Sequence, residues 1–180
     1  MGNIKTKLNR DAGFTLIEVL IVVVLLGILA TIIIPQISVS SEDARLNSLK
    51  TNLGNLRSAV ELYYWQHSSR YPGQYDEADG TTLLANAGDS ADAFIAQLTQ
   101  YSNVNGQTTV NSGVTGFTLG PYLRDGMPVN PYNNANTITC DVSTTDVTDR
   151  DAVAGDGTGW KFYIKTGVLI ANDDDAHEAF

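Results

Sequence analysis

Apolar residues are spread very unevenly along the 180-residue chain, and they predict a long helix at the amino end. Residues 19–34 read VLIVVVLLGILATIII, in which Thr31 is the one strongly polar side chain. Counted from Phe14, the run is 21 residues long. An α-helix of about that length covers roughly 31 Å, the thickness of the hydrocarbon layer of a bilayer. Residues 14–35 are therefore expected to cross a membrane once.

The charges that flank this run predict its orientation. Three cations precede it, Lys5, Lys7 and Arg10, whereas the first charges after it are the acidic Glu42 and Asp43. Because cationic flanks stay in the cytoplasm, the chain after residue 35 is expected to be exported. Hydropathy alone leaves two alternatives, an uncleaved anchor and a cleaved secretory signal peptide. The anchor is favoured because no clean A-x-A cleavage site follows the run.

After Pro35 the sequence becomes amphipathic and predicts that the helix continues to about Gln66. Apolar residues recur at steps of three and four, which places them along one face of a helix. This stripe consists of Leu46, Leu49, Leu53, Leu56, Val60 and Tyr63 or Tyr64. The stripe is expected to seat the helix on its own globular head. Pro35 lacks an amide hydrogen and is expected to kink the helix before the head.

The rest of the chain predicts a small head of mixed helix and strand. A short helix is expected after a cap at Asp89 or Ser90. Its apolar side consists of Phe94, Ile95 and Leu98. Residues 102–116 are rich in Asn, Gly and Thr and are expected to form a loop. Strands are expected at 137–142, 160–164 and 168–171, the last two as a hairpin. The expected fold is α+β, with the long helix packed against a small antiparallel sheet.

The composition excludes several classes of function. Acidic residues outnumber basic ones 20 to 11, a net charge of −9, so nucleic acid is not an expected partner. A single cysteine, Cys140, excludes an intramolecular disulfide and every all-cysteine zinc site. The histidines, His67 and His177, are remote from Cys140 in the sequence, and no nucleophile elbow or HExxH motif accompanies them. No enzymatic activity is therefore expected.

One charge lies inside the apolar run. Glu18 follows Phe14 by four residues. An acidic residue near the centre of a membrane costs roughly 2.5–3.5 kcal/mol on insertion scales, and less toward an end. Two explanations stay open at this point. Either the carboxylate lies at the interface beside a helix start, where the helix dipole favours it, or it has a function that offsets the cost.

The residues around Glu18 resemble a known signature. Residues 10–19 read RDAGFTLIEV, so that a short basic leader and a glycine precede FTLIEV and a long apolar helix. This resembles the amino-terminal signature of type IV pilins and of the pseudopilins of type II secretion. The resemblance implies that a membrane prepilin peptidase cuts between Gly13 and Phe14 and that Phe14 is then N-methylated. Residues 1–13 are then a cleaved leader, and the apolar segment is kept.

The same resemblance assigns Phe14 and Glu18 to assembly. Cleavage creates an α-amino group on Phe14, and the Glu18 carboxylate follows one helical turn along the chain. Pairing this amine with the carboxylate, within one subunit or between neighbours, offsets the cost of placing either charge in a low dielectric. The two residues are therefore expected to guide subunits into a filament.

The resemblance also implies a function and partners. A pilin-like fold is expected, and with it a structural subunit that polymerises with itself, most like a major pseudopilin because the chain cannot form the carboxy-terminal disulfide of many type IV pilins. The expected partners are prepilin peptidase, an inner-membrane assembly platform, minor pilins or pseudopilins, and membrane lipid before assembly. The expected location is the bacterial inner membrane, with residues 36–180 as a periplasmic head, and then a periplasmic or extracellular filament. A type IV pilus subunit for adhesion or motility and a single-span envelope binding protein are the alternatives.

This function requires no cofactor, but the acidic loops near the carboxyl end are a candidate calcium site. Calcium takes six to eight oxygen ligands in flexible geometry. Major pseudopilins, which the chain resembles, bind calcium in their carboxy-terminal loops. The candidate ligands are Asp141, Asp146, Asp149, Asp151, Asp156, Asp173, Asp174 and Asp175. Their spacing does not match an EF-hand loop, and a solvated acidic surface is the favoured alternative.

Overall fold

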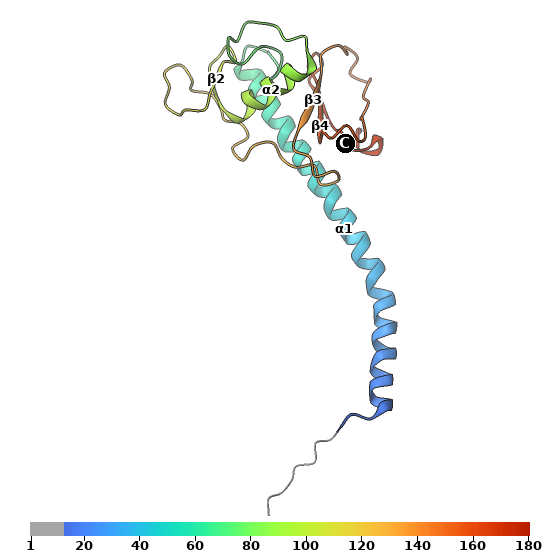
Figure 1. Ribbon diagram of the computed structural model, residues 1–180. Coiled ribbons are helices and arrows are strands. Elements are labelled where there is room, and N and C mark those ends of the chain that lie inside the picture. The colour runs from blue at the N-terminus through green and yellow to red at the C-terminus, as the bar shows by residue number, and fades with distance from the viewer. Residues whose placement is uncertain (1–12) are drawn as a thin grey trace, which may run out of the picture. The chain divides into compact units, whose positions relative to one another are not determined.

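The computed structural model describes residues 13–180, and residues 32–40 are described only as a stretch of helical backbone. The elements are the helices α1 (Leu16–Gln66) and α2 (Ala87–Thr99), the strands β1 (Tyr101–Ser102), β2 (Thr108–Thr109), β3 (Ile138–Asp141), β4 (Trp160–Tyr163) and β5 (Val168–Ala171), and the 3-10 helix η1 (Asp175–His177), as Figure 1 shows. The chain divides into two compact units, Met1–Asp43 and Ala44–Phe180. The second unit carries α2 and all five strands.

The described part of the first unit is dominated by the opening of α1. The large apolar side chains of residues 14–29 are 50–88% exposed, and they lie on every side of the helix. A helix that is apolar all round needs a covering from outside itself. Among residues with described side chains, no helix has the length and hydropathy that crossing a membrane requires. The expected kink at Pro35 and the leader cations Lys5, Lys7 and Arg10 lie outside the described residues.

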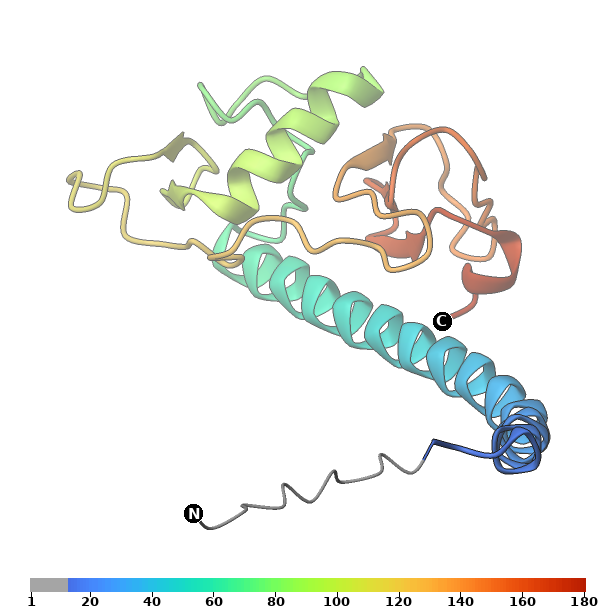
Figure 2. The same cartoon turned by 60° about the horizontal axis from the view of Figure 1, so that its bottom comes forward.

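In the second unit, α1 presents the apolar stripe that its sequence predicts. The stripe residues that are at most 2% exposed are Leu49, Leu53, Leu56, Val60 and Tyr63. They form one core with Phe94 and Leu98 of α2 and with Trp160 and Phe162 of β4. Figure 2 shows α2 and the strands on the same side of this part of α1. The helix ends at Gln66, as expected, because the stripe ends there.

The larger sheet has the strand order β3-β4-β5 and differs in one pairing from the expected antiparallel sheet. Strands β4 and β5 form the expected antiparallel hairpin, closed by a 2.8 Å hydrogen bond from the Gly167 amide to the Tyr163 carbonyl. Strand β3, however, pairs with β4 in parallel, from Ile138 beside Trp160 to Asp141 beside Tyr163. The long connection 142–159 permits this crossover, because parallel neighbours need a dozen residues or more between them. The α+β class is confirmed, and the fully antiparallel sheet is wrong.

Two local expectations in the head also need correction. The cap of α2 is Asn86, whose side chain accepts a 2.7 Å hydrogen bond from the Gly88 amide, while Ser90 is buried inside the helix. The expected loop 102–116 contains strand β2, which pairs antiparallel with β1. Strands of two residues leave no alternation in the sequence from which to predict them.

Candidate functional site

The expected cleavage point lies in an open stretch immediately before α1. Gly13, Phe14 and Thr15 precede the first helical residue, and the Phe14 side chain is 88% exposed. A Cβ placed on Gly13 meets no atom within 4 Å. The described residues therefore leave the Gly13–Phe14 bond uncovered.

Thr15 and Glu18 form a capping box at the start of α1. The Glu18 Oε2 atom accepts hydrogen bonds from the Thr15 amide and from Thr15 Oγ1, both 2.8 Å long. In return, the Glu18 amide donates to Thr15 Oγ1 at 3.3 Å. This reciprocal arrangement is the one that a Thr-x-x-Glu sequence favours at a helix start. Residues 15–18 read TLIE and so have this spacing, but the sequence analysis did not predict the contact.

Both side-chain bonds of the capping box end on the same carboxylate oxygen. Glu18 Oε1 therefore remains available to a further donor on the exposed side of the helix. Of the other polar side chains of the apolar run, Thr15 is used in the capping box, and Thr31 donates to the Ile28 carbonyl at 2.7 Å. Among the described residues of this run, Glu18 is thus the polar group that can reach a second molecule.

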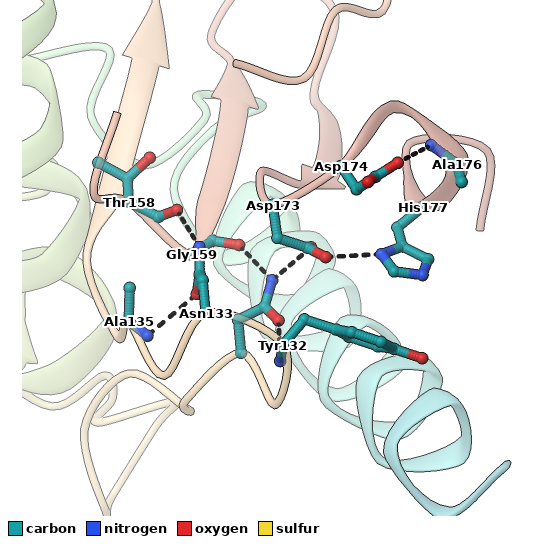
Figure 3. A network of polar contacts seen from close by, with 10 residues as sticks. Tyr132, Asn133, Ala135, Thr158, Gly159, Asp173, Asp174, Ala176 and His177 are labelled. Carbon is teal, nitrogen blue, oxygen red and sulfur yellow. Dashed lines mark hydrogen bonds and ion pairs between the residues drawn. The ribbon is translucent and has the colours of Figure 1, made fainter. Parts of the chain in front are cut away.

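A separate polar network ties together the loops around the larger sheet, and Figure 3 shows it. Its centre is the fully buried Asn130, whose Nδ2 donates to the Gly159 carbonyl at 2.9 Å and to Asp173 Oδ1 at 2.7 Å. The Asn130 amide donates to the Ala135 carbonyl, and its Oδ1 accepts from the Tyr132 amide. The network therefore fixes the 128–135 loop against the start of β4 and the end of β5.

The outer end of this network is an ion pair. His177 Nδ1 lies 2.6 Å from Asp173 Oδ2, and both side chains are mostly buried. The His177 ring packs at 4.2 Å between centroids from Tyr132 and at 5.8 Å from Phe180. His177 therefore holds the last residues of the chain against the 128–135 loop. This is a structural role.

Most of the candidate calcium ligands are used locally to stabilise turns. Burial acts to raise the pKa of Asp141, but four hydrogen bonds from the amides and hydroxyls of Ser143 and Thr144 outweigh it and lower the pKa to about 2. Asp146 accepts in the same way from Thr148, and Asp174 caps η1 by accepting from the Ala176 amide. These carboxylates already have donors.

The remaining candidates are also dispersed. Asp156 accepts from Thr158 and Asn172, and Asp173 belongs to the network around Asn130. Asp151 contributes its backbone carbonyl to Lys161 Nζ, while Asp149 and Asp175 lie in the adjoining turns. Within the described residues, no three His, Cys, Asp or Glu side chains come close enough to hold a metal ion. The eight aspartates therefore do not fit a shared side-chain calcium site.

The groups that could carry out covalent chemistry are in settings that suppress it. Burial raises the pKa of the Cys140 thiol to about 12, so the reactive thiolate is scarce at neutral pH. His67 is fully buried, stacked on Tyr63 at 3.7 Å, and bonded to the Tyr63 carbonyl and to Ser102 Oγ. Both residues serve the core.

The amino-terminal residues match a known family model. Residues 8–34 match the prokaryotic N-terminal methylation motif. This match includes Gly13, Phe14 and Glu18 and ends before the head.

Similarity to individual proteins extends further along the chain. The chain is 30% identical over 128 residues to type II secretion system core protein G of Pectobacterium carotovorum, covering 66% of this chain and 80% of that protein. It is 37% identical over 55 residues to the protein of the same name from Pseudomonas aeruginosa, covering 31% of this chain and 39% of that protein. It is also 37% identical over 62 residues to the Vibrio cholerae protein of that name, covering 34% of this chain and 42% of that protein. The last two matches span less than half of those relatives. No solved structure matches the chain.

Proposed function

The chain belongs to the family of type II secretion system core protein G, and from this membership we propose that it is a structural subunit of the type II secretion pseudopilus. In this role it is cut after Gly13, N-methylated on Phe14 and polymerised through α1 into a filament that supports protein export. Prepilin peptidase, an inner-membrane assembly platform and minor pseudopilins are its partners. The family is structural, and its subunits perform no catalysis in this role.

The observation that carries the proposal is the exposed apolar surface around the opening of α1. Residues 14–29 present large apolar side chains that are at least half exposed. Lipid covers such a surface before assembly, and the equivalent surfaces of other subunits cover it afterwards. The leader supports this sequence of events. Its removal takes away three cations and one acidic residue, so the net side-chain charge changes from −9 to −11 and the basic cytoplasmic anchor is lost.

Glu18 supplies the register that apolar packing lacks. Aliphatic contacts along α1 discriminate poorly between axial positions, because one turn of leucine and valine resembles the next. A carboxylate that pairs with the new Phe14 amine of a neighbour fixes one position. The capping box leaves Glu18 Oε1 available for this contact.

The experiment that tests the proposal is mass spectrometry of the protein extracted from membranes. The expected amino terminus is Phe14 with one added methyl group. Gly13→Leu is expected to block the cut, because the peptidase requires a small residue before the cleaved bond. Gly13→Ala is the matched control and is expected to be processed, since space around Gly13 is open in the fold.

Other termini would refute the proposal. A terminus near Glu42 would indicate an ordinary secretory signal peptide, and a chain that keeps Met1 in cells with active prepilin peptidase would indicate an uncleaved anchor. The measurement is made on individual subunits, so a defect in polymerisation does not affect it.

A further inference from the structure

Four peptide bonds of the chain join an aspartate or an asparagine to a glycine, and such bonds can rearrange spontaneously. They are Asp79–Gly80, Asn105–Gly106, Asp125–Gly126 and Asp156–Gly157. The rearrangement begins when the glycine amide nitrogen attacks the side-chain carbonyl carbon of the residue before it. Glycine favours the attack because it has no side chain and its backbone rotates freely. In a folded chain the attack also needs a side chain that can rotate and an amide that can leave its own hydrogen bond.

Two of the aspartates are held by donors in their own turns. Asp79 Oδ1 accepts from the amides of Thr81 and Thr82 at 2.7 and 2.8 Å, and its Oδ2 accepts from Thr82 Oγ1 at 2.6 Å. Asp156 Oδ1 accepts from the amide and the hydroxyl of Thr158 at 2.7 and 2.8 Å. Each carboxylate must give up these hydrogen bonds before it can turn toward the next amide, so both sites are protected.

The Asn105–Gly106 bond is protected on the side of the glycine. Gly106 is buried, and its amide donates to the Asn103 carbonyl at 2.9 Å. A Cβ placed on Gly106 would lie 2.7 Å from the Tyr63 hydroxyl oxygen. The backbone at Gly106 is therefore packed too closely to swing toward the exposed Asn105 side chain.

The Asp125–Gly126 bond lacks these restraints. Asp125 is exposed, and over the described part of the chain its carboxylate accepts no hydrogen bond and joins no ion pair. The Gly126 amide donates to the Leu123 carbonyl at 3.4 Å, which is longer than an ordinary N–H···O bond. A Cβ on Gly126 meets no atom within 4 Å. Both residues line a cavity of about 480 Å³ beside α1.

We propose that Asp125–Gly126 is a site of spontaneous isoaspartate formation. The Gly126 nitrogen forms a bond to Asp125 Cγ, the C–OH bond of the protonated carboxyl breaks, and the hydroxyl leaves with the amide proton as water. Water then opens the cyclic imide. If the bond between the nitrogen and the original peptide carbonyl breaks, the main chain runs through Cγ and gains one methylene. If the new bond breaks, the aspartate is restored. No group is oxidised or reduced, and water is the co-reactant.

The fold can accommodate the longer main chain at this point. Before the turn, the amides of Tyr122 and Leu123 both donate to the Leu98 carbonyl at 2.9 Å. After the turn, the Pro128 carbonyl accepts from Trp160 Nε1 at 2.8 Å. The extra methylene therefore lies in an exposed turn between two fixed segments. The proposal rests on the geometry of the head alone and is independent of the proposed function.

The test is to incubate the purified full chain in detergent at neutral pH and to follow isoaspartate at all four sites. Peptide mapping with electron-transfer fragmentation distinguishes isoaspartate from aspartate. Each rate is divided by that of a synthetic peptide with the same local sequence, which removes the intrinsic difference between Asn and Asp. At Asp125 the folded chain is expected to react within about threefold of its peptide, whereas the other three sites are expected to be slower than theirs by at least about tenfold.

Asp125→Glu is the matched control, because it keeps the charge and the exposed position but would have to close a larger ring. We expect no isomerised product at this position in the variant. Unfolding the parent chain in urea should bring all four sites close to the rates of their peptides. A folded chain that protects Asp125 as strongly as Asp79 and Asp156, or one in which all four sites react like their peptides, would overturn the proposal.

Discussion

At the level of single residues, Glu18 has one role that the structure shows, as a helix cap, and one that we propose, in assembly. Its Oε2 atom closes the capping box with Thr15 and so starts α1. Its charge lies in an apolar segment, where a cation from another subunit is the natural partner. The sequence predicted the second role through a family resemblance, and the structure added the first.

The two roles can be separated by substitution. Glu18→Gln keeps an acceptor oxygen for the capping box but removes the charge, and we expect processed protein in the membrane with few or no filaments. Thr15→Ala removes the capping partner but keeps the charge. It is expected to cost about 0.5–2 kcal/mol of helix stability at the start of α1 and to retain filaments.

The measurement is the amount of protein in membrane and sheared-filament fractions from cells that express only the variant. Normal filament yield from fully processed Glu18→Gln protein would show that the charge of Glu18 is not needed for assembly and that its role is that of a helix cap. Loss of filaments in both variants would mean that the helix start, rather than the charge, is what assembly requires.

His67 links stability to pH at the end of α1. Burial lowers its pKa, and hydrogen bonds with the Tyr63 and Asn103 backbone offset this only in part. The unfolded chain has an ordinary histidine, with a pKa of about 6.5. Below that pH the unfolded state binds a proton that the folded state binds less readily, so the free energy of unfolding falls as the pH falls.

We therefore expect the head to lose on the order of 1 kcal/mol of stability between about pH 7.5 and pH 5.5. Urea unfolding of the processed chain in detergent at the two pH values measures this. His67→Gln should unfold at a lower urea concentration throughout and show a flatter dependence on pH. His177→Gln leaves His67 in place and should retain the steeper dependence. A parent protein that is equally stable at both pH values would contradict the assignment.

At the level of elements, the helices and the hairpin followed from local patterns, while the sheet arrangement did not. The stripe from Leu49 to Tyr63 and the alternation in 160–164 are signals within one segment, so α1 and the β4–β5 hairpin could be predicted. The parallel pairing of β3 with β4 depends on the path of the 142–159 connection, which carries no periodic signal. The cap at Asn86 was missed because Asp89 and Ser90, inside the helix, are equally good capping types.

Among the residues of the candidate site, too, some could be predicted from a single segment and others could not. The proposed cleavage and assembly residues lie within one short motif, whereas Asn130, Gly159 and Asp173 meet only through the fold. The sequence could not decide whether each of the scattered aspartates is a calcium ligand or part of a turn. Their spacing does not show which carboxylates already accept hydrogen bonds from neighbouring residues. Asp141, with four such donors, illustrates the point.

Two glycines provide a test of how the elements are packed. A Cβ on Gly159, at the entrance to β4, would lie 2.3 Å from the Ala135 carbonyl oxygen, so Gly159→Ala must displace the 128–135 loop. We expect it to destabilise the head by about 1–3 kcal/mol. Gly54 lies within α1 with nothing within 4 Å of a Cβ. Gly54→Ala is expected to stabilise the head by about 0.5–1 kcal/mol through helix propensity.

Near-ultraviolet circular dichroism of thermal unfolding reports both effects, because the buried Trp160 lies next to Gly159. The pair forms its own control, since the same methyl group is added in both cases. A Gly159→Ala protein as stable as the parent would show that the 128–135 loop is not packed tightly against β4.

At the level of the whole molecule, the excess of acidic residues lies after residue 13. The proposed loss of residues 1–13 makes the net side-chain charge more negative, from −9 to −11, because these residues hold three cations and one acid. Self-repulsion of this size opposes non-specific association of the chains and is weakened by salt. Any divalent cation would therefore stabilise the head to some extent by screening, without a specific site.

The response to divalent cations decides between a calcium site and an acidic surface. In the part of the chain that the structure describes, no three carboxylates converge, and Asp141, Asp146, Asp156 and Asp174 already accept hydrogen bonds in their own turns. We therefore expect screening alone. Chelation of the purified chain should then leave the melting midpoint unchanged, and calcium and magnesium at equal concentration should shift it equally.

A specific site behaves differently, because a ligand that binds only the folded state adds stability in proportion to the logarithm of its concentration over the dissociation constant. A midpoint that falls on chelation and is restored by calcium but not by magnesium would require a calcium site built from carboxylates and backbone carbonyls together.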